Sequence, residues 1–246
     1  MMVGMKLPTF YTHAAQDPDG LARELAAFVA DHLKEALRER GQALLVVSGG
    51  STPIPFFEAL SAWPLEWSAV HVTLADERCV PDLNEHSNAR LVRQHLLRGH
   101  ARSAQLHPLL HEALGERPDQ HTRQARAEAM LSTLPWPADV VVLGMGSDGH
   151  TASLFPHAPE LAEALDPEGP RRCLAVSAPS LPNVPVPRLT LTARALLDSR
   201  VIVVHTTGAG KRELLEQACQ PGDTHPWPIR MVLLQDEVPC HLFHVD

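Results

Sequence analysis

The sequence is short of paired cysteines, of long apolar stretches and of positive charge. It contains four cysteines: Cys79, Cys173, Cys219 and Cys240. They show no C-x-x-C spacing and are too few for a disulfide framework in a chain of 246 residues, which favours a reducing compartment. Residues 1–10 lack a basic region followed by an apolar run, and no segment approaches the roughly 18 apolar residues of a membrane span. We therefore expect a soluble, cytoplasmic protein with no membrane partner.

The shortage of positive charge also limits the partners. Lys and Arg number 21 against 29 Asp and Glu, which gives a formal net charge of −8. Such a balance disfavours general attraction to a polyanion, so we expect no nucleic-acid partner. Any anionic ligand has to be held by a few placed Lys, Arg and backbone N–H groups. The sequence does not fix the oligomeric state, and a monomer or a dimer is plausible.

Short apolar runs alternate with helical patterns along the chain. The runs lie at 43–47, 70–74, 140–143 and 201–204, with a weaker candidate at 231–234. The helical patterns lie at 17–41, 53–60, 86–98, 118–133, 192–198 and 209–219. This alternation favours an α/β fold, a Rossmann-like and mostly parallel sheet with helices on both faces. No repeat or linker composition interrupts the chain, so we expect residues 1–246 to form a single domain.

Two glycine-rich segments follow predicted strands. Ser48-Gly49-Gly50-Ser51-Thr52 precedes a predicted helix, so its backbone N–H groups and hydroxyls can bind an anion, or it can be a glycine turn with a Ser or Thr helix cap. Gly144 to Gly149 satisfies G-x-G-x-x-G, but Pro156 and Pro159 interrupt the long helix that a dinucleotide site requires. We therefore do not favour nicotinamide binding.

His150 directly follows the second glycine-rich segment, at the carboxyl end of a predicted strand. Open α/β sheets place reactive groups at this edge, and a neutral imidazole can accept a proton. Asp76-Glu77-Arg78 follows the strand 70–74 and thus belongs to the same edge. Taken alone, a loop histidine can be structural and the charged triplet can be a solvated turn.

Two basic residues are candidates for binding phosphate, and no metal site is expected. Arg188 lies in Pro187-Arg188-Leu189-Thr190, and Lys211 begins the helix after the strand 201–204. His205 and Arg212 stand where a Walker loop needs Gly and Ser or Thr. Pro108 spoils the helical pairing of His107 with His111, and no Cys or carboxylate cluster completes a zinc site.

In this order, the motifs resemble the 6-phosphogluconolactonase family, whose fold is shared with glucosamine-6-phosphate deaminases and ribose-5-phosphate isomerases. The resemblance rests on four blocks: Ser48 to Pro53, Asp76-Glu77-Arg78 with Val80-Pro81 and Ser87-Asn88, Gly144 to Pro156, and Pro187 to Thr192 with Lys211. It covers most of the chain and implies one 6-phosphogluconolactonase-like domain over 1–246. It also implies hydrolysis of 6-phosphogluconolactone to 6-phosphogluconate, in the oxidative pentose phosphate pathway, with no metal and no organic cofactor.

The resemblance also assigns roles to individual residues. His150 matches the catalytic histidine, Asp148 is a candidate to orient its ring, and Arg78 matches an arginine that lines the substrate site. The phosphate-binding residues it implies are Ser48, Gly49, Gly50, Ser51, Thr52, Arg188 and Lys211, and we add Asp76 as a candidate substrate-binding residue. For the oxyanion of ester hydrolysis, the candidates are the N–H groups near Gly49 and Gly50 or at Gly146, and the Arg78 guanidinium.

Two other functions fit the same motifs less well. An amino-sugar-phosphate deaminase or isomerase typically carries an aromatic residue after Asp-Glu and Asn-Glu-Pro after Gly-His, where this chain has Arg78 and Thr151 to Pro156. A non-catalytic phosphosugar sensor would not need the base, yet His150 and Asp148 are both present. The chain departs from the family pattern in its proline-rich segment 184–187. Residues 225–246 match the pattern only loosely.

Overall fold

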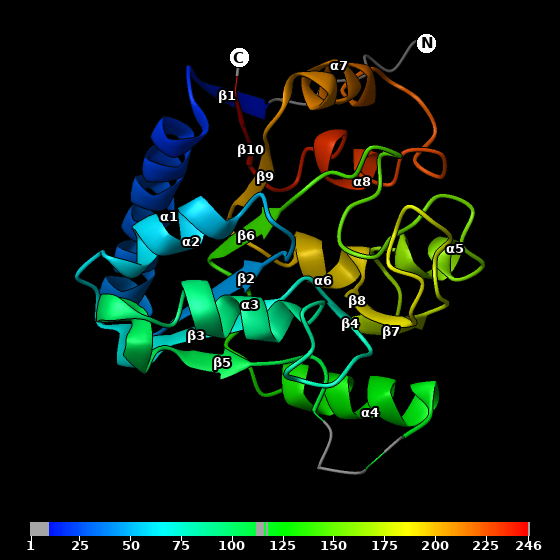
Figure 1. The fold of residues 1–246 in the computed structure, drawn as a ribbon, viewed down its shortest axis with the longest axis horizontal. Helices are drawn as coiled ribbons and strands as arrows, with labels where there is room; N and C mark the ends of the chain where they lie inside the picture. The colour runs from blue at the N-terminus through cyan, green and yellow to red at the C-terminus, as the bar shows by residue number, and fades with distance from the viewer. Residues whose placement is uncertain (1–9, 112–115, 117, 246) are drawn as a thin grey trace.

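The computed structural model describes residues 10–111, 116 and 118–245. Its centre is a seven-stranded sheet in which every neighbouring pair is parallel. In spatial order the strands are β1 (Phe10–Ala15), β10 (Cys240–Val245), β9 (Ile202–Thr206), β6 (Val140–Leu143), β2 (Ala43–Val47), β3 (Val70–Leu74) and β5 (Gln105–His107). The expected parallel α/β sheet is therefore present. The carboxyl ends of β2, β3, β6 and β9 lie at the same edge of this sheet (Figure 1).

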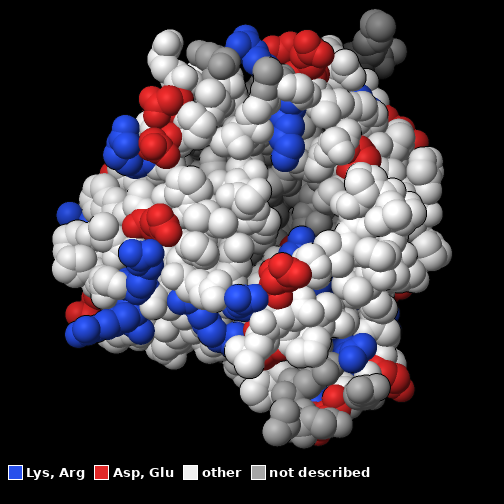
Figure 2. All heavy atoms as spheres, viewed as in Figure 1, with Lys and Arg blue, Asp and Glu red and all other residues white. Residues whose placement is uncertain are grey.

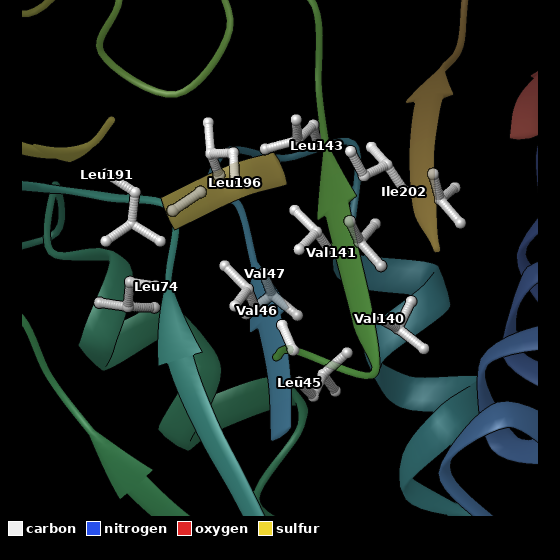
Figure 3. Packing of buried hydrophobic residues seen from close by; sticks show 14 of the residues in the cluster. Leu45, Val46, Val47, Leu74, Val140, Val141, Leu143, Leu191, Leu196 and Ile202 are labelled. Carbon is white, nitrogen blue, oxygen red and sulfur yellow. The ribbon is translucent and has the colours of Figure 1, made fainter. Parts of the chain in front are cut away.

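The apolar runs of the sequence form the middle of this sheet. Strands β2 and β6 are buried at every position, because side chains of a central parallel strand are covered on both faces. Val47 pairs with Val142, and Leu143 pairs with Val204. Figure 3 shows their aliphatic side chains packed with Leu191 and Leu196, which come from outside the sheet. This packing fixes the register of the strand ends.

The first helix shows how the sequence sets the limits of an element. Helix α1 (Pro18–Arg40) begins where the Asp17 carboxylate accepts a hydrogen bond from Gly20 N at 2.7 Å. It ends at Gly41, whose φ of 71° is the left-handed conformation that glycine adopts readily. Figure 1 shows α1 on one side of the sheet and α6 (Ala193–Leu197) on the other. None of the helices in the described part of the chain is long and apolar enough to cross a membrane.

The other predicted helices are present and mostly shortened at their ends, although the helix predicted at 53–60 ends one residue later, at Ser61. They are α2 (Ile54–Ser61), α3 (Asn88–His95), α4 (Gln120–Leu131) and α7 (Ala209–Ala218). Two short helices, α5 (Leu161–Ala164) and α8 (Arg230–Leu233), and two 3-10 turns (Trp67–Ala69 and Gly99–Ser103) complete the set within the described residues.

The weaker strand prediction at 231–234 is wrong. This run forms α8, and Met231, Val232 and Leu233 are buried there. A short apolar run fits a buried helix as well as a strand, so its periodicity could not decide between them. The last strand of the chain is instead β10. Neither β10 nor β1, at the other end of the chain, was predicted, because each mixes histidines with apolar residues.

A second, antiparallel sheet of three short strands was not predicted either. It consists of β4 (Asp76–Arg78), β8 (Arg188–Leu191) and β7 (Cys173–Val176), in that order. The pairing of Asp76 with Thr190 and of Arg78 with Arg188 brings two distant charged motifs together. This small sheet stands beside the carboxyl edge of the large one and forms one wall of the site described next.

Candidate active site

A cavity of about 370 Å³ opens at the carboxyl ends of β2, β6 and β9. Figure 2 shows it as a hollow near the middle of the molecular face, with basic side chains above and below. All of the predicted site residues except Asp148 line it: Ser48, Gly49, Gly50, Ser51, Thr52, Asp76, Arg78, His150, Arg188 and Lys211. The structure thus brings together residues that lie more than 160 positions apart in the sequence.

The loop after β6 carries His150 in a tight turn. Gly146 N donates to His150 O at 2.8 Å, and Thr151 Oγ1 donates to Gly144 O at 2.9 Å. A Cβ atom on Gly146 would lie 2.2 Å from His150 Nδ1, so only glycine leaves room for the ring. Gly149 has a φ of 76° and lies against Trp227, whose ring a Cβ there would approach to 2.9 Å. The turn therefore depends on both glycines.

Asp148 contacts His150 directly, a contact that the sequence left open. Its Oδ1 is paired with His150 Nδ1 and also accepts the backbone N–H of His150 at 3.2 Å. Burial opposes ionisation of Asp148, but the hydrogen bond and charge of His150 outweigh it and lower the pKa of this carboxyl. An ionised Asp148 places the ring proton on Nδ1, which leaves Nε2 as a proton acceptor. The His150 side chain is 20% exposed, so water can reach it.

The Ser48 loop leads from β2 into α2 without a side-chain cap. The first residue before the helix is Pro53, and no side chain accepts a hydrogen bond from the N-terminal backbone, so the helix-cap interpretation is wrong. Gly49 is packed so closely that a Cβ would lie 1.8 Å from Asn88 Oδ1, and Gly50 has a φ of 93°. Ser48 Oγ is buried and has no hydrogen-bond partner among the described residues.

Asp76 and Arg188 form a buried charged pair in the wall of the cavity. Their side chains lie 3.7 Å apart, at Oδ2 and Nη1, and Ser153 Oγ donates to Asp76 Oδ2 at 2.6 Å. Arg188 is 3% exposed, and its Nη2 donates to Val184 O at 2.9 Å. Burial lowers the pKa of Arg188 from its high ordinary value, and Asp76 opposes that change. Asp76 thus holds the guanidinium in position at the cavity wall.

Glu77 and Arg78 are not part of a solvated turn. Glu77 is 2% exposed and accepts the backbone N–H groups of Asn88 and Ala89, both at 2.8 Å, at the start of α3. Burial raises the pKa of Glu77 against these hydrogen bonds. Arg78 Nη1 donates to His86 O and Asn88 Oδ1 at 2.9 and 2.8 Å. The α3 start therefore fixes the guanidinium at the cavity.

Several cavity residues were missed by sequence reasoning. The motifs give Asn88 no role of its own and mark His205 only as a departure from a Walker loop, yet both residues line the cavity. Asn183 also lines it, directly before the proline-rich segment 184–187. A polar residue at the end of an otherwise aliphatic strand, as at His205, is the signal that could have found one of them.

The remaining motifs stand apart from this chemistry. His107 Nε2 lies 3.0 Å from His71 Nδ1, on neighbouring strands, and burial lowers the pKa of both rings. The described residues contain no group of three or more His, Cys, Asp or Glu side chains that could hold a metal ion. After Gly149 the chain runs through turns to the short α5, which is not the long helix of a dinucleotide site.

Known proteins resemble the chain over nearly its whole length. The family model for glucosamine-6-phosphate isomerases/6-phosphogluconolactonase matches residues 16–240. A 6-phosphogluconolactonase from Mesorhizobium japonicum is 48% identical over 231 residues, covering 94% of this chain and 93% of the relative. One from Pseudomonas aeruginosa is 48% identical over 217 residues, covering 86% of each.

Solved structures agree with the sequence relatives. A 6-phosphogluconolactonase from Shewanella baltica superposes with a TM-score of 0.89 at 40% identity, covering 98% of this chain and 99% of its own. A monomeric glucosamine-6-phosphate deaminase shares the fold, with a TM-score of 0.76 at 17% identity, covering 96% of this chain and 97% of its own. The chain therefore belongs to the glucosamine-6-phosphate isomerase/6-phosphogluconolactonase family.

Proposed function

We propose that this chain hydrolyses 6-phospho-D-glucono-1,5-lactone to 6-phospho-D-gluconate, the lactonase step of the oxidative pentose phosphate pathway. The observation that carries the proposal is the Asp148–His150 pair at one side of a cavity whose other sides carry Lys211 and Arg188. Relatives at 48% identity are named for this activity. A lactone is an ester, and its hydrolysis needs a base, an oxyanion site and a fixed substrate.

His150 acts as the general base. Its Nε2 removes a proton from water as the water oxygen attacks the lactone carbonyl carbon, while Asp148 stabilises the resulting imidazolium through Nδ1. The tetrahedral intermediate then collapses, the bond between that carbon and the ring oxygen breaks, and Nε2 returns the proton to the ring oxygen. Ring opening gives a carboxylic acid, which loses its proton to become a carboxylate, and the former ring oxygen becomes a free hydroxyl.

Arg78 and the Gly49–Gly50 backbone are the candidate oxyanion donors. Gly146 N–H, the third donor expected from the sequence, is excluded because it already donates to His150 O. The Arg78 guanidinium keeps an unpaired buried Nε while Nη1 is held by the α3 start. A guanidinium that is already fixed needs little reorganisation as negative charge develops.

The substrate phosphate is held by Lys211, Arg188 and the Ser48–Thr52 loop. Lys211 is half-buried at the start of α7, where burial lowers its pKa, so its ammonium gains from an anionic partner. Asp76 contributes by fixing Arg188. Binding energy from the phosphate then positions the distant carbonyl carbon beside His150.

Three further properties belong to the same proposal. The reaction needs no metal and no organic cofactor, because the base and the donors above supply each step. A cytoplasmic location accords with four cysteines that form no disulfide among the described residues. A single domain over 1–246 accords with one hydrophobic cluster that includes residues from Leu21 to Phe243.

The test generates 6-phosphogluconolactone in situ and subtracts its spontaneous hydrolysis. We expect the purified chain to accelerate loss of the lactone and formation of 6-phosphogluconate. Glucosamine 6-phosphate is assayed in parallel for release of ammonia, the reaction of the related deaminases. No acceleration of lactone loss would refute the proposal, and ammonia release without it would assign the other activity.

A further inference from the structure

His205 is a buried polar residue in the cavity that the mechanism above does not use. It lies near the end of β9 and is 3% exposed. Its Nε2 is fully buried and has no hydrogen-bond partner among the described residues. An unpaired buried polar atom is costly, and in native proteins it usually has a water, an ion or a ligand as partner. His205 lines the cavity, so a molecule that enters the cavity can supply this missing partner.

The charge of the ring suits an anion site that already contains a lysine. Burial, and then the nearby charge of Lys211, lower the pKa of His205 to about 4. The ring is neutral near pH 7, so it stands beside Lys211 without repulsion between like charges. A neutral imidazole still offers one N–H donor. Lys211 can thus supply the positive charge, while His205 supplies a directional hydrogen bond.

Packing alone does not account for this residue. The His205 ring meets the Phe56 ring edge-on, with centroids 6.4 Å apart. The preceding positions 201–204 are aliphatic and buried, and another aliphatic side chain would also pack there without an unpaired nitrogen. Ser48 Oγ is a second buried, unpaired atom lining the same cavity. Two such atoms, in a cavity that Lys211 also lines, form the kind of donor set that binds a phosphate group.

We propose that His205 is a substrate-binding residue whose neutral imidazole donates a hydrogen bond from Nε2 to an oxygen of the substrate phosphate. The inference rests on the proposed lactonase function. A phosphate dianion offers only acceptor oxygens, so the bound ring carries its proton on Nε2. No covalent bond is made or broken at His205, and its contribution is to affinity and to the placement of the phosphate.

Two substitutions separate a donor from a packing residue. His205→Leu keeps the bulk and removes the hydrogen bond, whereas His205→Gln keeps an N–H donor near the position of Nε2. We expect His205→Leu to raise KM for 6-phosphogluconolactone about ten-fold, with kcat within about three-fold of the wild type. His205→Gln should stay within about three-fold of the wild-type KM. The KM for unphosphorylated gluconolactone should be the same in all three proteins.

The outcomes that overturn the proposal are distinct from failure of the lactonase assignment. A wild-type protein without lactonase activity refutes the proposed function. With an active wild type, a wild-type KM in the Leu variant refutes the role of His205. An equal KM rise in the Leu and Gln variants, or an equal rise for the unphosphorylated lactone, also refutes it, because packing would then explain the effect.

A measurement on the wild-type protein covers the case in which the Leu variant does not fold. Imidazole ¹⁵N NMR is recorded while the protein is titrated with 6-phosphogluconate, and the His205 signals are identified by their loss in His205→Gln. We expect a protonated Nε2 whose resonance shifts on saturation, and no shift with unphosphorylated gluconate. An Nε2 resonance unaffected by 6-phosphogluconate would overturn the proposal.

Discussion

Two Asp-x-His turns in this chain have almost the same local geometry and different surroundings. In each, the carboxylate Oδ1 accepts the histidine backbone N–H, at 3.2 Å for Asp148–His150 and 3.0 Å for Asp223–His225. In each, the same oxygen contacts the ring Nδ1, and the contact lowers the pKa of the aspartate. The His150 side chain is 20% exposed inside the cavity, and the His225 side chain is 56% exposed outside it.

The comparison shows that an Asp-His contact does not by itself indicate a catalytic base. Backbone geometry over three residues produces the contact in both turns. Only His150 lies where the ends of β2, β6 and β9 enclose a cavity together with Arg78, Arg188 and Lys211. Position relative to the cavity and its basic residues therefore distinguishes the two turns, and the variants below test that distinction.

Replacement of the two histidines should give the largest difference. His150→Ala should lower kcat for 6-phosphogluconolactone by roughly 10²–10⁴, because it removes the positioned acid–base group. His225→Ala should leave kcat within about two-fold, since its ring lies outside the cavity. Steady-state kinetics and thermal melting of both variants check the prediction. A fully active, folded His150→Ala protein would remove His150 from the mechanism.

Gly146→Ala should affect activity almost as strongly without removing a functional group. The added Cβ would lie 2.2 Å from His150 Nδ1 and 2.8 Å from Asp148 Oδ1, so the ring must move. We expect kcat to fall roughly 10²-fold, the cost of displacing a reacting group by about 1 Å. Gly210→Ala is the matched control, since a Cβ there meets nothing within 4 Å. Wild-type kcat in Gly146→Ala would show that the ring position is not critical.

Exchange of the aspartates for asparagine should have a smaller effect. Asp148→Asn should lower kcat/KM about ten-fold near neutral pH, because the imidazolium loses a charge-assisted hydrogen bond. Asp223→Asn should leave kcat/KM unchanged, because that turn lies outside the cavity. If both variants behave alike, surroundings do not distinguish the turns.

The smallest effect concerns stability and contrasts His225 with the buried His205. The pKa of His205 is about 4 in the folded protein against an ordinary value of 6.5, so between these values the unfolded chain binds an extra proton. Stability present above about pH 6.5 is therefore lost as the pH falls towards 4. Over this pH range, His205→Gln should lose less stability than the wild type. His225→Ala should lose as much stability as the wild type. Urea unfolding near pH 7 and near pH 5 measures this, and parallel losses in all three proteins would contradict it.

The sequence allowed the four middle strands of the large sheet, β9, β6, β2 and β3, and most helices to be predicted because their signals are local. The run 43–47 is apolar throughout and became β2 with the same limits, and Asp17 and Gly41 bound α1 as capping chemistry requires. Strands β4, β7 and β8 were missed because they are three or four residues long and exist through pairing with distant segments. The run 231–234 had no local signal to separate helix from strand.

Sequence motifs identified many of the residues that line the candidate cavity, but not the contacts among them. Motifs placed Ser48, Arg78 and His150 at one sheet edge, since parallel strands end together. The pairing of Asp76 with Arg188 depends on the antiparallel register of β4 and β8, which no local pattern encodes. His205 was not assigned a role, because the meaning of a histidine at a strand end depends on burial, which only the fold shows.

The most direct test of the account removes the phosphate from the substrate and leaves the protein intact. Without phosphate, His150 keeps its partner and its place but loses the positioning of the carbonyl by Lys211 and Arg188. We predict that the wild-type kcat/KM for unphosphorylated gluconolactone is at least about 10²-fold below that for 6-phosphogluconolactone. Equal values for the two lactones would contradict the claim that the anion site makes His150 a catalytic base.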